Sequence, residues 1–399
     1  MMDKNKSTIV ISVFAILLIL TTTIALAAGN EFSVLVDHDG DVGEYPSMAI
    51  VDGFPAIAYQ DYENYALKYV RALDARGRNW GTPITIDLGD PSRYQYNGYI
   101  SLVVVDGNPA IAFYDYDQYN LYFVRSTDAQ GTNWGTPVCA DCGSVDRGEV
   151  SAMTVVNGNP AIIYQDYDNE DTYYVRAEDS KGTTWGTPVY VSDNYPYDID
   201  IVIANGKPAV SIFDEDTDEV VYILADDTNG TTWGTPQVID SLSDYDELSM
   251  TIVNGNPAIA YYDYDNEIMY YKRAANADGT SWGERVVVRE NDYVDSYQDM
   301  VVIDGYPTIA YQRNSEDETD DDLALIQASD VNGTAWKEPR ILLSANDIGM
   351  YNSMVSLGYG LGVATYDGTD DDLWYFSYIG SVDPEGRFQN YLPLINRNH

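Results

Sequence analysis

The chain has 399 residues, of which 64 are acidic and 21 basic, and its formal net charge is −43. A surface this negative repels nucleic acid and anionic lipid, so we expect no nucleic-acid partner. The same charge also serves simply to keep a protein soluble, and it does not by itself name a ligand.

Residues 1–28 have the pattern of an export signal. Lys4 and Lys6 precede an apolar run, Ile9–Leu20, and Ala25–Ala27 supplies small residues for cleavage. We therefore expect an extracellular or cell-surface protein with no membrane span after signal cleavage. A retained N-terminal anchor stays open as an alternative, because the uncharged stretch from Ser7 to Asn30 is long enough to cross a bilayer.

One sequence pattern recurs through the rest of the chain at intervals of 48 to 54 residues. Asp-Gly or Asn-Gly stands between two apolar runs, an Asp-Tyr-Asp turn follows, and Gly-x-x-Trp precedes a last short run. The copies are marked by Pro55, Pro109, Pro160, Pro208, Pro257, Pro307 and Leu361. Because Asp-Gly between β-branched runs favours a hairpin and no helical periodicity intervenes, each copy predicts the four strands of one propeller blade.

The two ends of the chain complement each other. Seven markers occur, but only six copies carry the tryptophan of the fourth strand: Trp80, Trp134, Trp185, Trp233, Trp282 and Trp336. Phe32–Asp37 has the pattern of the missing strand. We therefore predict an all-β, seven-bladed β-propeller of four-stranded antiparallel blades over residues 31–380. Its ring is closed by the N-terminal strand, which completes the last blade, and residues 381–399 form a C-terminal tail.

Length variation is concentrated in the links from each fourth strand to the next blade. These links and the turns after the second strands are expected on one face, where tyrosine, aspartate and non-repeated arginines gather. The candidate ligand-binding residues are Arg93, Tyr94, Tyr96, Arg147, Tyr195, Tyr197, Arg289, Tyr293 and Arg313. Tyrosine offers a flat face and a hydroxyl, so carbohydrate or another surface polymer is the expected partner of a monomer. Arg313 has a second interpretation, a salt bridge to the acidic run at 316–322.

Two acidic patterns and one cysteine pair complete the candidates. Asp37, Asp39 and Asp41 alternate along the chain in a spacing that suits calcium. The aspartates six residues after the markers are expected to cap turns, with cation binding as the alternative. Cys139 and Cys142 predict a small disulfide, because a zinc site would need two further ligands.

The turn before each tryptophan carries a family resemblance. Ser126, Asp128, Gly131 and Trp134 resemble the Asp-box (BNR-type) repeat of sialidase-like propellers, with one extra residue between Asp and Gly. The resemblance implies that the Asp caps the turn and the Trp packs between strands, away from any active site. The Phe/Tyr-Arg-Ile-Pro signature of sialidases is absent from the sequence.

These observations favour an exported, non-catalytic binding or adhesion protein that presents a Tyr- and Asp-rich face to carbohydrate, with calcium as a candidate cofactor. No catalytic residue is assigned. A glycoside hydrolase or lyase with a degenerate sialidase-like site is one alternative, and a purely structural surface protein with a flat face is the other.

Overall fold

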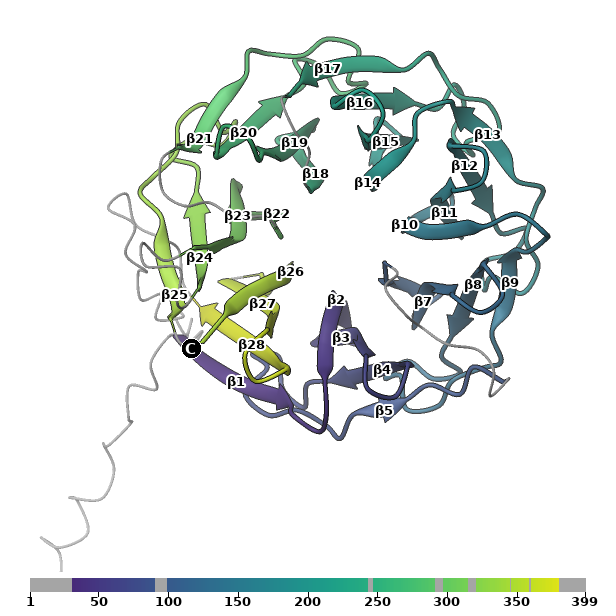
Figure 1. The fold of residues 1–399 in the computed structure, drawn as a ribbon, viewed down its shortest axis with the longest axis vertical. Coiled ribbons are helices and arrows are strands. Elements are labelled where there is room, and N and C mark those ends of the chain that lie inside the picture. Colours follow the sequence, from purple (N-terminus) through teal and green to yellow (C-terminus); the bar gives the residue numbers. More distant parts are fainter. Residues whose placement is uncertain are drawn as a thin grey trace, which may run out of the picture.

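A computed structural model describes residues 31–89, 99–242, 247–290, 297–314, 321–344, 346–358 and 360–379. These residues form seven four-stranded antiparallel sheets arranged as a ring (Figure 1). The predicted seven-bladed β-propeller is confirmed. Within the described residues, no helix is long and apolar enough to cross a membrane.

Each blade runs from an inner strand beside the axis to an outer strand at the rim. The inner strands are β2 (Val42–Val51), β6 (Ser101–Val105), β10 (Arg147–Val156), β14 (Pro196–Ala204), β18 (Leu248–Val253), β22 (Asp299–Ile303) and β26 (Ile348–Ser356). The second strands are β3 (Phe54–Asp61), β7 (Asn108–Asp115), β11 (Asn159–Asp166), β15 (Lys207–Asp214), β19 (Asn256–Asp263), β23 (Tyr306–Arg313) and β27 (Gly360–Asp367).

The remaining two positions complete the blades. The third strands are β4 (Ala66–Arg71), β8 (Asn120–Arg125), β12 (Asp171–Arg176), β16 (Glu219–Leu224), β20 (Ile268–Arg273), β24 (Asp322–Gln327) and β28 (Asp372–Ile379). The outer strands are β5 (Ile84–Thr85), β9 (Val138–Asp141), β13 (Val189–Ser192), β17 (Gln237–Ser241), β21 (Val286–Glu290), β25 (Arg340–Ser344) and, from the N-terminus, β1 (Glu31–Asp37).

Strand β1 closes the ring as predicted. It pairs antiparallel with β28 from Glu31–Tyr378 to Asp37–Leu373, so the last blade contains both ends of the fold. This pairing leaves no open seam between the first and last blades, and an exposed sheet edge is what closure removes. At the inner end of the blades, the Asp-Gly and Asn-Gly hairpins turn with positive φ at both residues, for example Asp52 at 47° and Gly53 at 80°.

The turns after the second strands and the links between blades lie on one face. The amide of Tyr62 in such a turn donates to the carbonyl of Asp41 in a link, and Tyr167 donates likewise to Asp146. The second-strand aspartates end inside these turns, where Asp61 accepts the amide of Asn64 at 2.9 Å. Turn capping, the structural role expected for these aspartates, is therefore present.

A second set of turns joins neighbouring blades on the opposite face. We call box turns the segments 74–80, 128–134, 179–185, 227–233, 276–282 and 330–336. In each of them the Trp Nε1 donates to the Gly carbonyl three residues earlier. Each Trp also meets, edge to face, an aromatic ring on the third strand of the preceding blade, with centroids 5.0–5.4 Å apart. The Trp packing implied by the family resemblance thus joins two blades.

A hydroxyl completes this joint in five of the six junctions. Tyr174, for example, donates to the carbonyl of Asn229 at 3.0 Å in the next box turn. Phe123 occupies the same position in β8 and has no hydroxyl to donate. Leu325 occupies the same position in β24. The next blade is the closing one, and its outer strand β1 comes from the N-terminus, so no box turn precedes it.

The hydrogen bond from the third-strand tyrosine to the next box turn gives a stability prediction with an internal control. Tyr174→Phe should lower the free energy of unfolding by about 1 kcal/mol, the net value of a typical hydrogen bond. Phe123→Tyr should leave it unchanged or raise it, because the added hydroxyl faces the equivalent carbonyl. Urea unfolding of both variants measures this, and equal losses in both would contradict the assignment.

Candidate functional site

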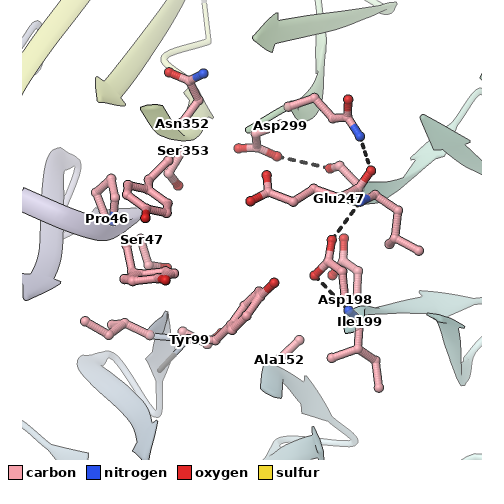
Figure 2. A pocket seen from close by; sticks show the side chains of 18 of the residues that line it. Pro46, Ser47, Tyr99, Ala152, Asp198, Ile199, Glu247, Asp299, Asn352 and Ser353 are labelled. Carbon is pink, nitrogen blue, oxygen red and sulfur yellow. Dashed lines mark hydrogen bonds between the residues drawn. The ribbon is translucent and has the colours of Figure 1, made fainter. Parts of the chain in front are cut away.

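The inner strands surround an axial cavity of about 220 Å³. Its walls come from residues near the start of the inner strand in every one of the seven blades. The propeller therefore brings together side chains that are far apart in sequence. Figure 2 shows Tyr99 and Pro46 on one side and Asp198 and Glu247 on the other.

Aromatic side chains form one half of the cavity mouth. Ten residues before the marker, four consecutive blades carry Tyr297, Tyr351, Tyr45 and Tyr99, which we call the tyrosine arc. Tyr351, Tyr45 and Tyr99 line the cavity, and Tyr297 packs on Tyr351. Ring centroids are 4.6 Å apart for Tyr297–Tyr351, 4.4 Å for Tyr351–Tyr45 and 6.1 Å for Tyr45–Tyr99. Burial raises the pKa of Tyr45 and Tyr351 well above the usual range, so the arc stays uncharged.

The other half of the mouth is apolar and acidic. The same sequence position holds Val150, Asp198 and Glu247 in the remaining three blades. Asp198 is buried, and its two oxygens accept the amides of Ile199 at 2.8 Å and Leu248 at 2.7 Å. Glu247 extends into the cavity (Figure 2). One rim of the cavity thus offers π faces and the facing rim offers carboxylates.

Backbone irregularities aim the tyrosines inward. The β2–β3 and β26–β27 ladders shift register between Glu44 and Ser47 and between Met350 and Ser353. Such bulges turn side chains out of the strand's regular alternation. Tyr45, Tyr297 and Tyr351 have φ values of 47°, 63° and 49°, which are unfavourable for a bulky residue. Residues held in such conformations concentrate at functional sites.

Below the mouth, a ring of side chains ties each blade to the next. The residue eight before the marker accepts a backbone amide of the following inner strand in six of the seven blades. Ser47, for example, accepts the amide of Leu102 at 2.9 Å, and Ser353 accepts that of Met48 at 3.0 Å across the closing junction.

The exception is Ala152, which has no acceptor to offer. The amide of Ile201 in the following blade instead bonds to its neighbour Asp200 at 2.7 Å, while the second oxygen of Asp200 accepts the amide of Met250 at 2.9 Å. One carboxylate therefore satisfies an amide of its own strand and also joins that strand to the next blade. A serine in place of Asp200 could not accept both amides with separate oxygens.

Two acids of this ring, Asp200 and Asp299, have raised pKa values. Burial raises the pKa of Asp200 to about 7, the amides of Met250 and Ile201 oppose this, and the charge of Asp299 adds to it. Burial likewise raises the pKa of Asp299 to about 6, against hydrogen bonds from Met354 and Ser249. The charge of the cavity floor therefore grows as pH rises through this range.

The five predicted ligand-binding residues that the structure describes do not gather in one pocket. Arg93, Tyr94, Tyr96 and Tyr293 lie outside the described residues. Arg147 is bound to Asp141 at 2.8 Å and to Asp166 at 3.0 Å, so its guanidinium is held by carboxylates of the blades themselves.

The other predicted residues lie in separate blades. Arg289 is in outer strand β21, within 2.9 Å of Glu338, and so lies far from the axis. Arg313 pairs with Asp322 at 3.2 Å, which agrees with the salt-bridge interpretation. Tyr195 packs edge to face on Tyr167, with centroids 6.2 Å apart. Only Tyr197 approaches the cavity, where its carbonyl accepts the Tyr99 hydroxyl at 3.4 Å.

Two of the three predicted metal ligands, Asp37 and Asp41, are engaged with other groups. Asp37 lies 2.8 Å from Lys68 and accepts the Tyr59 hydroxyl at 2.7 Å. Asp41 accepts the Tyr366 hydroxyl at 3.0 Å. In the described part of the chain, no three acidic, histidine or cysteine side chains, Asp39 included, gather to hold a metal ion. Calcium binding at Asp37, Asp39 and Asp41 stays a prediction.

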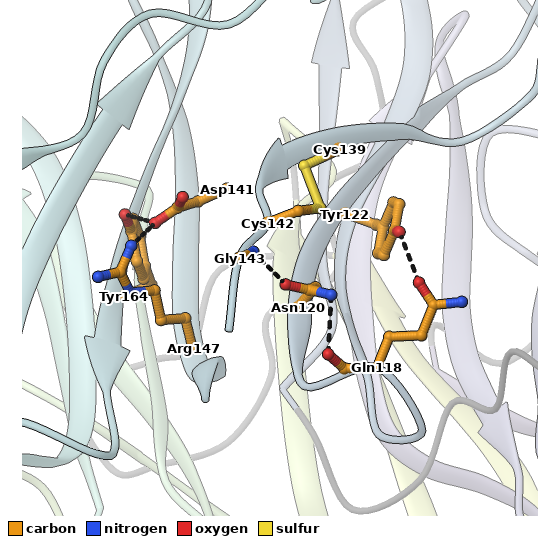
Figure 3. Close-up of a disulfide and its surroundings, with 9 residues drawn as sticks. All are labelled: Gln118, Asn120, Tyr122, Cys139, Asp141, Cys142, Gly143, Arg147 and Tyr164. Carbon is orange, nitrogen blue, oxygen red and sulfur yellow. Dashed lines mark hydrogen bonds and ion pairs between the residues drawn. A yellow bond between two sulfur atoms is a disulfide. The ribbon is translucent and has the colours of Figure 1, made fainter. Parts of the chain in front are cut away.

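The cysteine pair lies at the end of β9. Cys139 and Cys142 are joined by a disulfide, and the next residue, Gly143, donates its amide to Asn120 at 2.8 Å (Figure 3). Asp141, between the two cysteines, accepts bonds from Arg147 and Tyr164 of the following blade. The small loop thus fixes a contact between two blades at the rim.

Sequence analysis missed the tyrosine arc and the two facing acids. The signal available was the column ten residues before the marker, where four blades carry Tyr and two carry an acid. We selected candidates by the composition of the links, and this position was left out because it lies where a link meets its inner strand.

Comparisons with known proteins support the fold. No family model and no curated protein matches the chain. Among solved structures, AofleA from Arthrobotrys oligospora aligns at 10% identity, with TM-score 0.50, over 79% of this chain and 90% of its own. The Hadza microbial sialidase Hz136 aligns at 12% identity, with TM-score 0.52, over 86% and 66%.

A third solved structure extends over more of the chain. BBS1N, in complex with ARL6DN, aligns at 7% identity, with TM-score 0.55, over 90% of this chain and 97% of its own. At such identities the likeness establishes a shared propeller architecture. The neighbours include sialidase-type and arabinanase-type propellers.

The acids of the cavity floor predict a pH dependence of stability. Since the folded-state pKa of Asp200 is raised to about 7 from 3.8, its contribution to stability is full below about pH 4 and is lost as pH rises through 7. Asp200→Asn removes that titration. The free energy of unfolding of Asp200→Asn relative to the unmodified chain should therefore shift in favour of the variant between pH 4 and pH 8. A constant difference across the range would contradict the raised pKa.

Proposed function

We propose that this protein is an exported, non-catalytic carbohydrate-binding propeller whose axial cavity holds a sugar. The observation that carries the proposal is the tyrosine arc facing Asp198 and Glu247 across one cavity. Apolar faces of sugar rings pack on aromatic side chains, and carboxylates accept bonds from sugar hydroxyls. The surrounding face, with exposed Tyr116 and Tyr167, gives a longer polymer further surface to contact.

Several features support binding over catalysis. Hydrolysis of a glycosidic bond uses two carboxyl groups in acid, base or nucleophile roles. Asp198, the natural partner of Glu247 at the mouth, directs both oxygens to backbone amides. The described residues that line the cavity also include no arginine, whereas sialidase-like sites use an arginine triad for the substrate carboxylate.

A glycoside hydrolase that acts through Glu247 is the second candidate function. It is favoured by the position of Glu247 within a cavity and by the sialidase among the solved structures of similar fold. A purely structural surface protein is the weakest of the three candidates, because it gives no reason for two tyrosines, Tyr45 and Tyr351, held at positive φ in the lining of a cavity. Export and calcium dependence belong to the proposal as further expectations.

Replacing one tyrosine of the arc tests the proposal. Tyr351→Ala should weaken glycan binding by about tenfold or more, because Tyr351 lies between Tyr45 and Tyr297 at the centre of the arc. Tyr264→Ala is the matched control, since Tyr264 is 56% exposed and does not line the cavity. Both variants are measured on a glycan array, with and without calcium, and by calorimetry on the best ligand.

The outcomes separate the candidate functions. Loss of binding in Tyr351→Ala alone supports the axial site, and equal losses in both variants would assign binding to the outer face instead. Shortened products in mass spectra of the incubated glycans would contradict a non-catalytic role. Their loss in Glu247→Gln would then establish the hydrolase.

A further inference from the structure

Two neighbouring blades carry tyrosine pairs on the face where the inner strands begin around the axial cavity. In the turns after the second strands, Tyr62 packs with Tyr65, and Tyr116 packs with Tyr119, with ring centroids 6.3 Å and 6.0 Å apart. We call these four residues the outer tyrosine pairs. They belong to the blades β2–β5 and β6–β9, which are adjacent in the ring (Figure 1).

The outer tyrosine pairs depart from the repeat at a position where the backbone disfavours an aromatic residue. The fourth residue after the second-strand aspartate has positive φ in all six of these turns that the structure describes. These residues are Tyr65, Tyr119, Glu170, Asp218, Glu267 and Asp371. The φ values of 53° at Tyr65 and 55° at Tyr119 are unfavourable for a bulky side chain and more acceptable for aspartate. Local backbone preference therefore does not account for these two tyrosines.

The pairs present ring surface to solvent. Tyr65, Tyr116 and Tyr119 are 44%, 42% and 48% exposed, and Tyr62 is half-buried. The exposed tyrosines in the equivalent turns of two other blades, Tyr167 and Tyr264, have no second tyrosine in the same turn. Apolar surface that gathers in one place marks an interaction site, whereas a single exposed apolar residue is ordinary.

The two blades with outer pairs also contribute to the cavity lining. Tyr45 lies in β2 and Tyr99 just before β6, and both line the cavity. Neighbouring strands are about 5 Å apart, so the second and third strands lie about 5 and 10 Å farther out than the inner strand. Aromatic surface therefore begins at the axis and continues outward over these two blades.

The next three blades contrast with these two. Their inner position, ten residues before the marker, holds Val150, Asp198 and Glu247, and their outer position, in the turn, holds Glu170, Asp218 and Glu267. Among the six blades described at both positions, only the blades β2–β5 and β6–β9 have a tyrosine at each. The face around the cavity is thus divided into an aromatic sector and an acidic one.

The charges of the aromatic sector restrict the polymer that fits it. Glu63 and Asp117 are exposed within the turns of the two pairs, and no described residue of the cavity lining is Lys, Arg or His. An anionic polymer would be repelled by these carboxylates and by the net charge of the chain. Neutral sugar rings carry no charge to repel, and their apolar faces pack on tyrosine rings.

We propose that a neutral polysaccharide binds with its terminal sugar in the axial cavity and its following sugars over the outer tyrosine pairs, so that the site favours long chains over short ones. This rests on the proposed carbohydrate-binding function and names its ligand class. At about 220 Å³, the cavity is smaller than the roughly 300–1,000 Å³ of sites for drug-sized molecules. A terminal sugar therefore enters while the rest of the chain stays outside and meets the aromatic sector.

Calorimetry with chains of different length tests the proposal on the full protein. The probes are cellobiose and cellohexaose, with N-acetylated chitobiose and chitohexaose as a second neutral pair. The better hexamer should bind at least tenfold more tightly than its dimer. The double variant Tyr65→Asn/Tyr119→Asn should remove that advantage and leave dimer binding unchanged. Asparagine tolerates positive φ, so the turns keep their conformation, and the retained dimer binding verifies the fold.

Two comparison variants separate the outer pairs from other tyrosines. Tyr190→Asn/Tyr264→Asn removes two tyrosines that are 50% and 56% exposed and lie outside the two blades, and it should keep the hexamer's advantage. Tyr351→Ala, within the cavity lining, should weaken the dimer and the hexamer by the same factor. If Tyr190→Asn/Tyr264→Asn weakens hexamer binding as much as Tyr65→Asn/Tyr119→Asn, the contact is non-specific and the proposal is overturned.

The remaining outcomes distinguish this inference from the proposed function. Equal affinity for dimer and hexamer would overturn the extended site while leaving the axial carbohydrate site intact. Tighter binding of hexagalacturonate, an anionic hexamer, than of either neutral hexamer would overturn the neutral ligand class. Binding of neither neutral hexamer would overturn the inference, and an empty glycan array in addition would overturn the carbohydrate-binding function itself.

Discussion

The axial cavity depends on one repeated hydrogen bond, in which a side chain near the start of the inner strand accepts an amide of the next inner strand in six of the seven blades. The bond joins the blades at the smallest radius of the ring, where Ser47, Ser101 and their equivalents lie. With box turns joining the blades on the opposite face and β1 closing the circle, seven strand starts are held around one axis. The side chains two residues before these acceptors then face the cavity and one another.

This geometry explains why identical blades produce an asymmetric site. A regular ring would present the same residue seven times, but here the mouth changes from four tyrosines to Val150, Asp198 and Glu247. The hydrogen bonds between inner strands tolerate this change, because they are made by residues two positions further along each strand. Where the framework position itself is altered, at Ala152, the bond between the two inner strands is missing, and Asp200 accepts the amide of Ile201 within its own strand. The mouth therefore varies while six of the seven joints stay in place.

Much of the fold follows from sequence, because it depends on local and periodic signals. Six tryptophans against seven markers predicted an outer strand supplied by the N-terminus, and β1 has that place. The site forms where the starts of all seven inner strands meet at the propeller axis, and spacing along the chain does not reveal which side chains meet there. Arg289 was predicted as a binding residue from its loop, yet its strand lies at the rim. Tyr99 reaches the axis, although only its neighbours Arg93, Tyr94 and Tyr96 were predicted. The unpaired oxygens of Gln298 and Asn352 are likewise invisible in sequence, because they depend on which groups a neighbouring blade places opposite.

The central claim is that ligand enters along the propeller axis. A crystal of the protein soaked with the glycan that binds most tightly on the array tests this most directly. The account predicts difference density in the axial cavity, with a sugar ring against Tyr351 and a sugar hydroxyl within hydrogen-bond distance of Glu247. Density between blades, at the rim or beside the box turns, with the cavity holding only water, would contradict it.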